Sequence, residues 1–176
     1  LPPLEAFPDS IFVEDPAFVV PQGAILLRPG APSRLGEREH MREVLKRHFG
    51  GVQELADGEY ADGGDVLITP KTIFIGLSKR TNRAGAEALQ TALKSLGREA
   101  RVVQTPSTIL HFKTASSLLD EETILVTRAM ADSGVFEGFR LIVTPDGEEG
   151  AANALRINNM VLVGDIFPQT RDLIQK

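Results

Sequence analysis

Short apolar runs separated by turn residues dominate the first part of the chain. Runs at residues 11–13, 17–20 and 24–27 predict strands, and Gly23 supplies the turn between the last two. A helix is predicted after Gly36, because apolar side chains recur at helical spacing from Met41 to Phe49 before Gly50-Gly51 ends the pattern. A further strand at 52–55 completes a unit of strand, strand, helix and strand.

This unit begins again three times along the chain. The second copy has predicted strands at 66–68, 73–76 and 100–103, and a helix from about Asn82, a plausible N-cap, to Leu96. The third and fourth copies have predicted strands at 110–112, 123–126, 141–143, 151–155 and 160–163, and helices near 130–136 and from 167. A unit repeated at roughly 40 to 50 residues is typical of radial or solenoid arrays. We therefore expect the first strands to face a shared centre.

Charged residues and a histidine accompany these first strands. Glu14 and Asp15 follow the run at 11–13, and the motif Asp62-Gly63-Gly64-Asp65 precedes the run at 66–68. His111 lies in the run at 110–112. Burying an unpaired carboxylate is costly unless a partner or ligand compensates. If the first strands share a centre, these side chains converge there, which predicts a pocket for a planar cation.

Each feature has a plainer explanation when it is taken alone. The Asp-Gly-Gly-Asp motif is compatible with a tight turn, since Asp and Gly are the commonest turn residues. His111, between Leu110 and Phe112, is compatible with a core histidine, and Arg34 and Arg80 with solvated loop arginines. A binding pocket requires these residues to converge in space, whereas ordinary structural roles do not.

Composition narrows the classes of function. With 176 residues, 42% of them hydrophobic and 24% charged, the chain is expected to form one domain over residues 1–176, truncated at both ends. A net charge of −5 argues against a nucleic-acid partner, and no apolar run is long enough for a membrane span, so a cytoplasmic location is predicted. The chain has no cysteine and only three scattered histidines, so no metal site is expected.

Five motifs, taken together, resemble one known family. They cover residues 7–15 (Phe-Pro-Asp-Ser-Ile-Phe-Val-Glu-Asp), 28–34 (Arg-Pro-Gly-Ala-Pro-Ser-Arg), 62–67 (Asp-Gly-Gly-Asp-Val-Leu), 76–82 (Gly-Leu-Ser-Lys-Arg-Thr-Asn) and 110–113 (Leu-His-Phe-Lys). In this order they resemble the dimethylarginine dimethylaminohydrolase family of the guanidine-modifying pentein superfamily. The resemblance implies an α/β fold, a five-bladed α/β propeller of strand-strand-helix-strand modules, of which this chain covers about three and a half.

The resemblance also implies a reaction and a set of site residues. The substrate is a cationic amino acid, N-methylated arginine, which is hydrolysed to citrulline and a methylamine without a metal or organic cofactor; homodimer formation stays open. His111 matches the general acid/base, and Asp62 the acidic residue that orients it and the guanidinium. The implied substrate contacts are Asp15 with Glu14 beside it for the guanidinium, Asp9 for the α-amine, and Arg34 and Arg80 for the α-carboxylate.

One departure from the family pattern leaves other functions open. The family attacks the guanidinium carbon with a cysteine thiolate near its C-terminus, forming a covalent thiouronium, whereas this chain has no cysteine. We expect these residues alone to bind ligand without turnover. The alternatives are an arginine deiminase or amidinotransferase-like enzyme and a non-catalytic binding module on the same fold. The Phe-Val-Glu-Asp and Ser-Lys-Arg-Thr-Asn motifs favour the methylarginine hydrolase, and the retained charged residues oppose the binding module.

Overall fold

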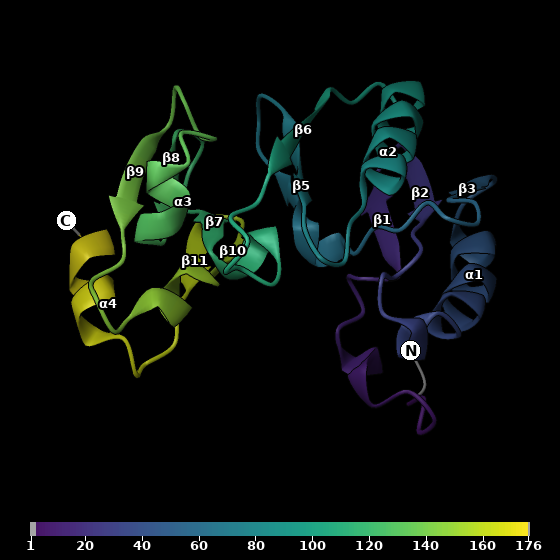
Figure 1. Cartoon of the computed structure of the whole chain (residues 1–176), viewed down its shortest axis with the longest axis horizontal. Helices are drawn as coiled ribbons and strands as arrows, with labels where there is room; N and C mark the ends of the chain where they lie inside the picture. The colour runs from purple at the N-terminus through teal and green to yellow at the C-terminus, as the bar shows by residue number, and fades with distance from the viewer. Residues whose placement is uncertain (1–2, 176) are drawn as a thin grey trace.

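The computed structural model describes residues 3–175, which form three complete copies of one module and part of a fourth (Figure 1). In each complete copy, two antiparallel strands are followed by a helix and by a third strand parallel to the second. The strands are β1 (Ala17–Val20), β2 (Gly23–Leu26), β3 (Val52–Glu54), β4 (Val66–Ile68), β5 (Ile73–Leu77), β6 (Ala100–Gln104), β7 (Ser116–Leu118), β8 (Thr123–Val126) and β9 (Arg140–Val143). The helices of these modules are α1 (Glu37–His48), α2 (Arg83–Ser95) and α3 (Arg128–Asp132).

The partial fourth module begins with an antiparallel hairpin, β10 (Leu155–Ile157) and β11 (Met160–Leu162), and continues into α4 (Pro168–Ile174). The repeated unit predicted from the sequence is therefore confirmed, as is the α/β class. The expected total of five blades exceeds what residues 3–175 display and stays a prediction.

Helix α2 illustrates how local sequence fixes an element. The Asn82 side chain caps it by accepting a hydrogen bond from the Gly85 N–H at 2.8 Å, which confirms the predicted N-cap. Ala86, Leu89 and Leu93 lie on one face of the helix and are fully buried in the core of the first two modules. A second core, which includes Phe74, Phe112 and Phe136, joins the second and third modules.

The first strands of the modules lie side by side, since β4 contacts β7 and β7 contacts β10. Residues of β1, β4, β7 and β10 together line one hollow of about 680 Å³. The expectation that the first strands share a centre is therefore confirmed. In Figure 1 the first module lies at the right and the third at the left. Among the described residues, the structure contains no helix with the length and apolar character needed to cross a membrane.

Three predicted strands are wrong, and all three precede the true first strands. Residues 11–13 fall in the 3₁₀ helix η1 (Pro8–Ile11) and the turn after it, since Pro8 fits the first turn of a helix and Phe12 and Val13 remain exposed. The predicted strand at 110–112 is replaced by a bend leading into the 3₁₀ helix η4 (Phe112–Thr114). The strand at 151–155 is replaced by η5 (Glu149–Ala152), with β10 following.

These corrections matter for the chemistry, because the charged residues lie in turns and not within strands. Asp62 precedes the 3₁₀ helix η3 (Gly63–Asp65), which leads directly into β4. Turn backbone leaves N–H groups free for side-chain carboxylates, whereas strand backbone uses them in the sheet.

Candidate active site

Side chains from the starts of three modules meet in one buried cluster. Asp15 comes just before β1, Asp62 just before η3 and β4, and His111 just before η4 and β7. One ligand-type atom from each of these three residues lies within 4.8 Å of the others. Asp62 is completely buried and Asp15 nearly so. The predicted convergence of Asp15, Asp62 and His111 is therefore present.

Gly63 and Gly64 allow this convergence because a Cβ at Gly63 would collide with the backbone of Glu14 and a Cβ at Gly64 would crowd Asp15 and His111. A Cβ on Gly63 would lie 1.9 Å from the Glu14 carbonyl oxygen, and one on Gly64 would lie 3.1 Å from Asp15 Oδ1. The Gly64 N–H instead donates to Asp15 Oδ1 at 2.7 Å. The motif is thus more than a tight turn, since it brings the first and second modules into contact.

Asp62 offers an acceptor that no neighbour uses. Its Oδ1 accepts a hydrogen bond from the Gly30 N–H at 2.6 Å. Its Oδ2 is buried and accepts no hydrogen bond from the described residues; it lies 3.8 Å from His111 Nε2 and 3.7 Å from Arg80 Nη1. Burial raises the pKa of Asp62 to about 6; the Gly30 hydrogen bond opposes this rise, and the charge of Asp15 adds to it.

Asp65, which the sequence analysis quoted in its motif without giving it a role, lies on the other side of the imidazole. Its Oδ1 accepts from the Phe112 N–H at 2.9 Å, and its Oδ2 accepts from the Ser78 and Thr81 hydroxyls at 2.6 and 2.7 Å. His111 Nδ1 lies 3.5 Å from the same Oδ2. Its position as the second acid of the Asp-Gly-Gly-Asp motif was the one feature of the sequence that could have indicated a role for Asp65.

The charge of His111 is set by competing effects. Burial alone would lower its pKa, but the neighbouring carboxylates, Asp65 first and then Asp15 and Asp62, outweigh burial and raise it. The neighbouring carboxylates therefore stabilise the cationic form of the imidazole, which suits a group that must donate a proton.

Arg34 is buried and engaged with the protein. Its Nη1 donates to Asp15 Oδ2 at 2.5 Å, and its Nε and Nη2 donate to the two carboxylate oxygens of Glu37 at 2.9 and 2.7 Å. Its Nη2 also donates to the carbonyl oxygens of Asp9 and Phe12. Burial opposes its charge, but the bonds to Glu37 and Asp15 outweigh burial and raise the pKa of Arg34. In this geometry Arg34 holds Asp15 in position. Glu37 also bonds to Arg34 and was not predicted from the sequence.

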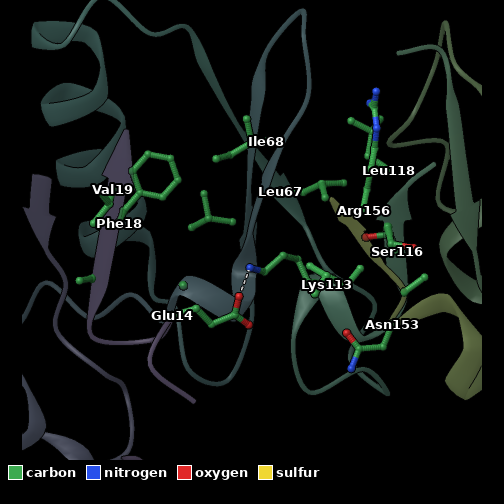
Figure 2. A pocket seen from close by; sticks show the side chains of 16 residues that line it. Glu14, Phe18, Val19, Leu67, Ile68, Lys113, Ser116, Leu118, Asn153 and Arg156 are labelled. Atoms are coloured by element: carbon green, nitrogen blue, oxygen red, sulfur yellow. Dashed lines mark hydrogen bonds and ion pairs between the residues drawn. The ribbon is translucent and has the colours of Figure 1, made fainter. Parts of the chain in front are cut away.

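The remaining predicted residues are more exposed. Arg80 has 28% of its side chain exposed and extends toward Asp62. Glu14 forms an ion pair with Lys113 at one end of the hollow, where Figure 2 shows the two side chains facing each other. Asp9 is exposed, and its backbone oxygen receives the Arg34 bond.

The hollow and the charged cluster are separate spaces. Asp15, Asp62 and His111 do not line the hollow, whose walls include Phe18, Leu67 and Leu118. The prediction that these three residues surround the central hole is therefore wrong, whereas Glu14 does line the hollow. The cause is again their position in turns before the first strands.

A metal ion fits this cluster poorly although the spacing of its atoms would allow one. Both oxygens of Asp15 already accept hydrogen bonds, from Gly64 and from the Arg34 cation. A second cation would have to displace or lie beside that guanidinium. We assign no metal ligands, and a metal-free site stays a prediction.

Comparison with known proteins agrees with this geometry. A family model described as arginine deiminase matches residues 3–162. The dimethylarginine dimethylaminohydrolase of Pseudomonas aeruginosa is 35% identical over 177 residues, which cover 100% of this chain and 69% of that protein. The chain belongs to the dimethylarginine dimethylaminohydrolase family. The Streptomyces coelicolor family member is 36% identical, over 98% of this chain and 66% of that protein, so the chain spans about two thirds of the length of these relatives.

Solved structures support the same family. The P. aeruginosa enzyme, in a cysteine-to-serine variant complexed with citrulline, superimposes with a TM-score of 0.94 at 35% identity, covering 99% of this chain and 69% of that one. An amidinotransferase from Microseira wollei superimposes with a TM-score of 0.77 at 18% identity, covering 97% of this chain and 61% of that one, which shows a shared fold alone. The described residues therefore share the architecture of the P. aeruginosa enzyme.

Proposed function

We propose that residues 1–176 provide the substrate-orienting and acid–base groups of a dimethylarginine dimethylaminohydrolase, which converts N-methylated arginine to citrulline and a methylamine. The observation that carries the proposal is the unused, buried Oδ2 of Asp62, directed at His111 Nε2 in a cluster built from three modules. A buried acceptor without a donor is costly, and a planar guanidinium would supply the missing N–H groups. The citrulline complex of the P. aeruginosa relative supports this substrate class.

In this proposal the two ends of the amino acid are bound by different groups. Asp62 accepts hydrogen bonds from the guanidinium nitrogens with its unused oxygen, and the substrate guanidinium lies beside that of Arg34 at Asp15, whose oxygens each keep a second lone pair besides the bonds from Gly64 and Arg34. Glu14 lies beside them, and Asp9 receives the α-amine. Arg80 binds the α-carboxylate, since an arginine fork matches a carboxylate. Arg34 would have to give up five hydrogen bonds to act as a second clamp, so we propose that it supports Asp15 instead.

His111 acts twice in the proposed reaction. A thiolate attacks the guanidinium carbon, the C–N bond to the methylated nitrogen breaks, and protonated His111 gives its proton to the departing methylamine. Neutral His111 then takes a proton from water, which attacks the same carbon and breaks the C–S bond to release citrulline. The thiolate has to come from outside residues 1–176, because these contain no cysteine.

The test is to produce residues 1–176 within a polypeptide that also supplies the cysteine, and to measure both products. We expect dimethylarginine to yield citrulline and dimethylamine in equal amounts. Release of ammonia from unmethylated arginine, with no dimethylamine from dimethylarginine, would reject the proposal in favour of an arginine deiminase, the activity after which the matching family model is described.

We also propose that these residues form a single domain that acts in the cytoplasm, and that the protein pairs as a homodimer. The acidic net charge of −5 is compatible with a cationic small-molecule ligand. Sedimentation of the purified protein tests the pairing, and a single monomeric species would reject it.

A further inference from the structure

We infer that Asp65 is a positioning residue that holds His111 and the loop of Arg80 in the positions needed for proton transfer and substrate binding. This assignment rests on the proposed function. Asp65 is fully buried, and both of its carboxylate oxygens accept hydrogen bonds from the protein. It acts through the groups that bond to it, which belong to two separate loops.

The first of these loops carries the histidine. The Phe112 N–H donates to Asp65 Oδ1 at 2.9 Å, which fixes the backbone immediately after His111. His111 Nδ1 lies 3.5 Å from Asp65 Oδ2, a distance at which charge attraction acts although the hydrogen bond is long. Such bonds often tighten only when substrate is bound.

The second loop carries the arginine. The hydroxyls of Ser78 and Thr81, which flank Lys79 and Arg80, both donate to Asp65 Oδ2. Ser78 Oγ in turn accepts the backbone N–H of Arg80 at 2.9 Å. One carboxylate therefore anchors the backbone next to His111 and, through Ser78, the backbone of Arg80.

The two acids of the Asp-Gly-Gly-Asp motif have different hydrogen-bonding states, which implies different tasks. Both oxygens of Asp65 are occupied by protein donors. Asp62 keeps one oxygen unused. Asp65 thus holds the ring at Nδ1, while Asp62 at Nε2 is available to substrate.

This division predicts the tautomer of the imidazole. With charged Asp65 at Nδ1, neutral His111 keeps its proton on Nδ1 and directs the Nε2 lone pair toward the substrate site. The other charged groups around the ring are Asp62 at Nε2, Asp15, and Arg80 beside Asp62. Lys113, two residues further on, is paired with Glu14.

A purely structural role for Asp65 would predict loss of stability without a change in the chemistry of the ring. The experiment is therefore ¹⁵N NMR of the imidazole of His111 in the 176-residue chain, recorded across a pH titration. We expect neutral His111 to be protonated at Nδ1 in the unaltered chain. A ring protonated mainly at Nε2 overturns the inference, and this measurement needs no substitution.

Asp65→Asn then tests the cause. Removing the Asp65 carboxylate, which lies 3.5 Å from His111 Nδ1, should lower the measured pKa of His111, and the Nδ1 tautomer should lose its preference. The matched control is Glu148→Gln, another buried carboxylate that accepts four hydrogen bonds, here from Gln169 and Thr170 at the start of α4. The control should lose stability and keep the His111 signals. An Asp65→Asn chain that folds and keeps the original pKa and tautomer overturns the inference.

Ser78→Ala provides a second variant if Asp65→Asn does not fold. It keeps the charge at Asp65 but releases the Arg80 loop, so the His111 tautomer should stay and the affinity for dimethylarginine should fall several-fold. An unchanged affinity overturns the link to Arg80. In the same samples, failure of the unaltered chain to bind dimethylarginine while the Nδ1 tautomer is present would reject the proposed function and leave the role of Asp65 at the ring intact.

Discussion

Asp62 Oδ2 lies 3.8 Å from His111 Nε2, and neither atom forms a hydrogen bond with the other at that distance. The two side chains come from different modules, and Arg80 Nη1 lies 3.7 Å from the same carboxylate oxygen. The carboxylate oxygen therefore keeps its capacity to accept a hydrogen bond from a ligand. Four predictions follow from this relationship and from its surroundings.

The first prediction concerns Asp62→Asn, which keeps the shape of the side chain and removes its charge. Binding of dimethylarginine should weaken by about 1.5 to 3 kcal/mol, the usual contribution of a hydrogen bond to a charged group. Titration calorimetry on the 176-residue chain measures this. Asp120→Asn is the matched control, because Asp120 accepts hydrogen bonds from its own turn and is exposed. Equal affinity in the Asp62 variant and the control would contradict the proposed contact.

The second prediction is a pH dependence of binding with a defined sign. Because the pKa of Asp62 is raised to about 6, protons compete with a cationic ligand for this carboxylate below that pH. Affinity for dimethylarginine should therefore rise between pH 5 and about 7 and then level off. Asp62→Asn should flatten the curve over this range. An affinity that falls as pH rises through 6 would mean that another group controls binding.

The same raised pKa affects folding in the opposite direction. The folded chain holds the Asp62 proton more tightly than the unfolded chain, whose pKa is near 3.8. The contribution of Asp62 to folding is thus most favourable below about pH 4 and is lost as pH rises through about 6. The site keeps a charge that costs stability at neutral pH, as expected of a group kept for binding.

The third prediction concerns the close approach at Gly63. Gly63→Ala would place a Cβ 1.9 Å from the Glu14 carbonyl oxygen, so the backbone of one module must move. We expect the free energy of unfolding to fall by about 1 to 3 kcal/mol. Gly51→Ala is the control, because no atom lies within 4 Å of its Cβ. Denaturant unfolding that shows equal stability for the two variants would contradict the tight packing of the motif.

The accuracy of the sequence-based predictions depended on the kind of segment. The second strands and helices α1 and α2 were predicted well, because their apolar spacing reflects burial against the module itself. The segment at 11–13 is equally apolar, but Phe12 and Val13 lie exposed in the loop before β1. Apolar character alone does not distinguish a buried strand from an exposed turn.

The sequence predicted which residues form the site better than it predicted the hydrogen bonds that hold them in place. Asp15, Asp62 and His111 were predicted from their positions at or beside short apolar runs and from the family motifs. The bonds of Asp65 to Ser78, Thr81 and Phe112 join residues 13 to 47 positions apart, and no local pattern reveals them. The Arg34 network depends likewise on how the segment at 9–15 packs against α1.

The fourth prediction separates the two arginines that the sequence analysis treated alike. Arg34→Met removes the guanidinium shared by Asp15 and Glu37 and leaves two buried carboxylates without their partner. Breaking a buried pair in this way should lower the free energy of unfolding by about 3 to 5 kcal/mol. Arg80→Met should change stability little, because Arg80 is partly exposed and its Nη1 lies as far as 3.7 Å from the Asp62 carboxylate.

The two variants should also differ in how their ligand affinity depends on the α-carboxylate. Arg80→Met should weaken dimethylarginine severalfold but leave the affinity for an analogue that lacks the α-carboxylate unchanged, because only the carboxylate contact is lost. Arg34→Met, measured under conditions where it stays folded, should weaken both ligands alike, because displacement of Asp15 affects the guanidinium end that they share. If Arg34→Met instead discriminated between the two ligands, Arg34 would be the clamp for the carboxylate, and its bonds to Asp15 and Glu37 would have to open when substrate binds.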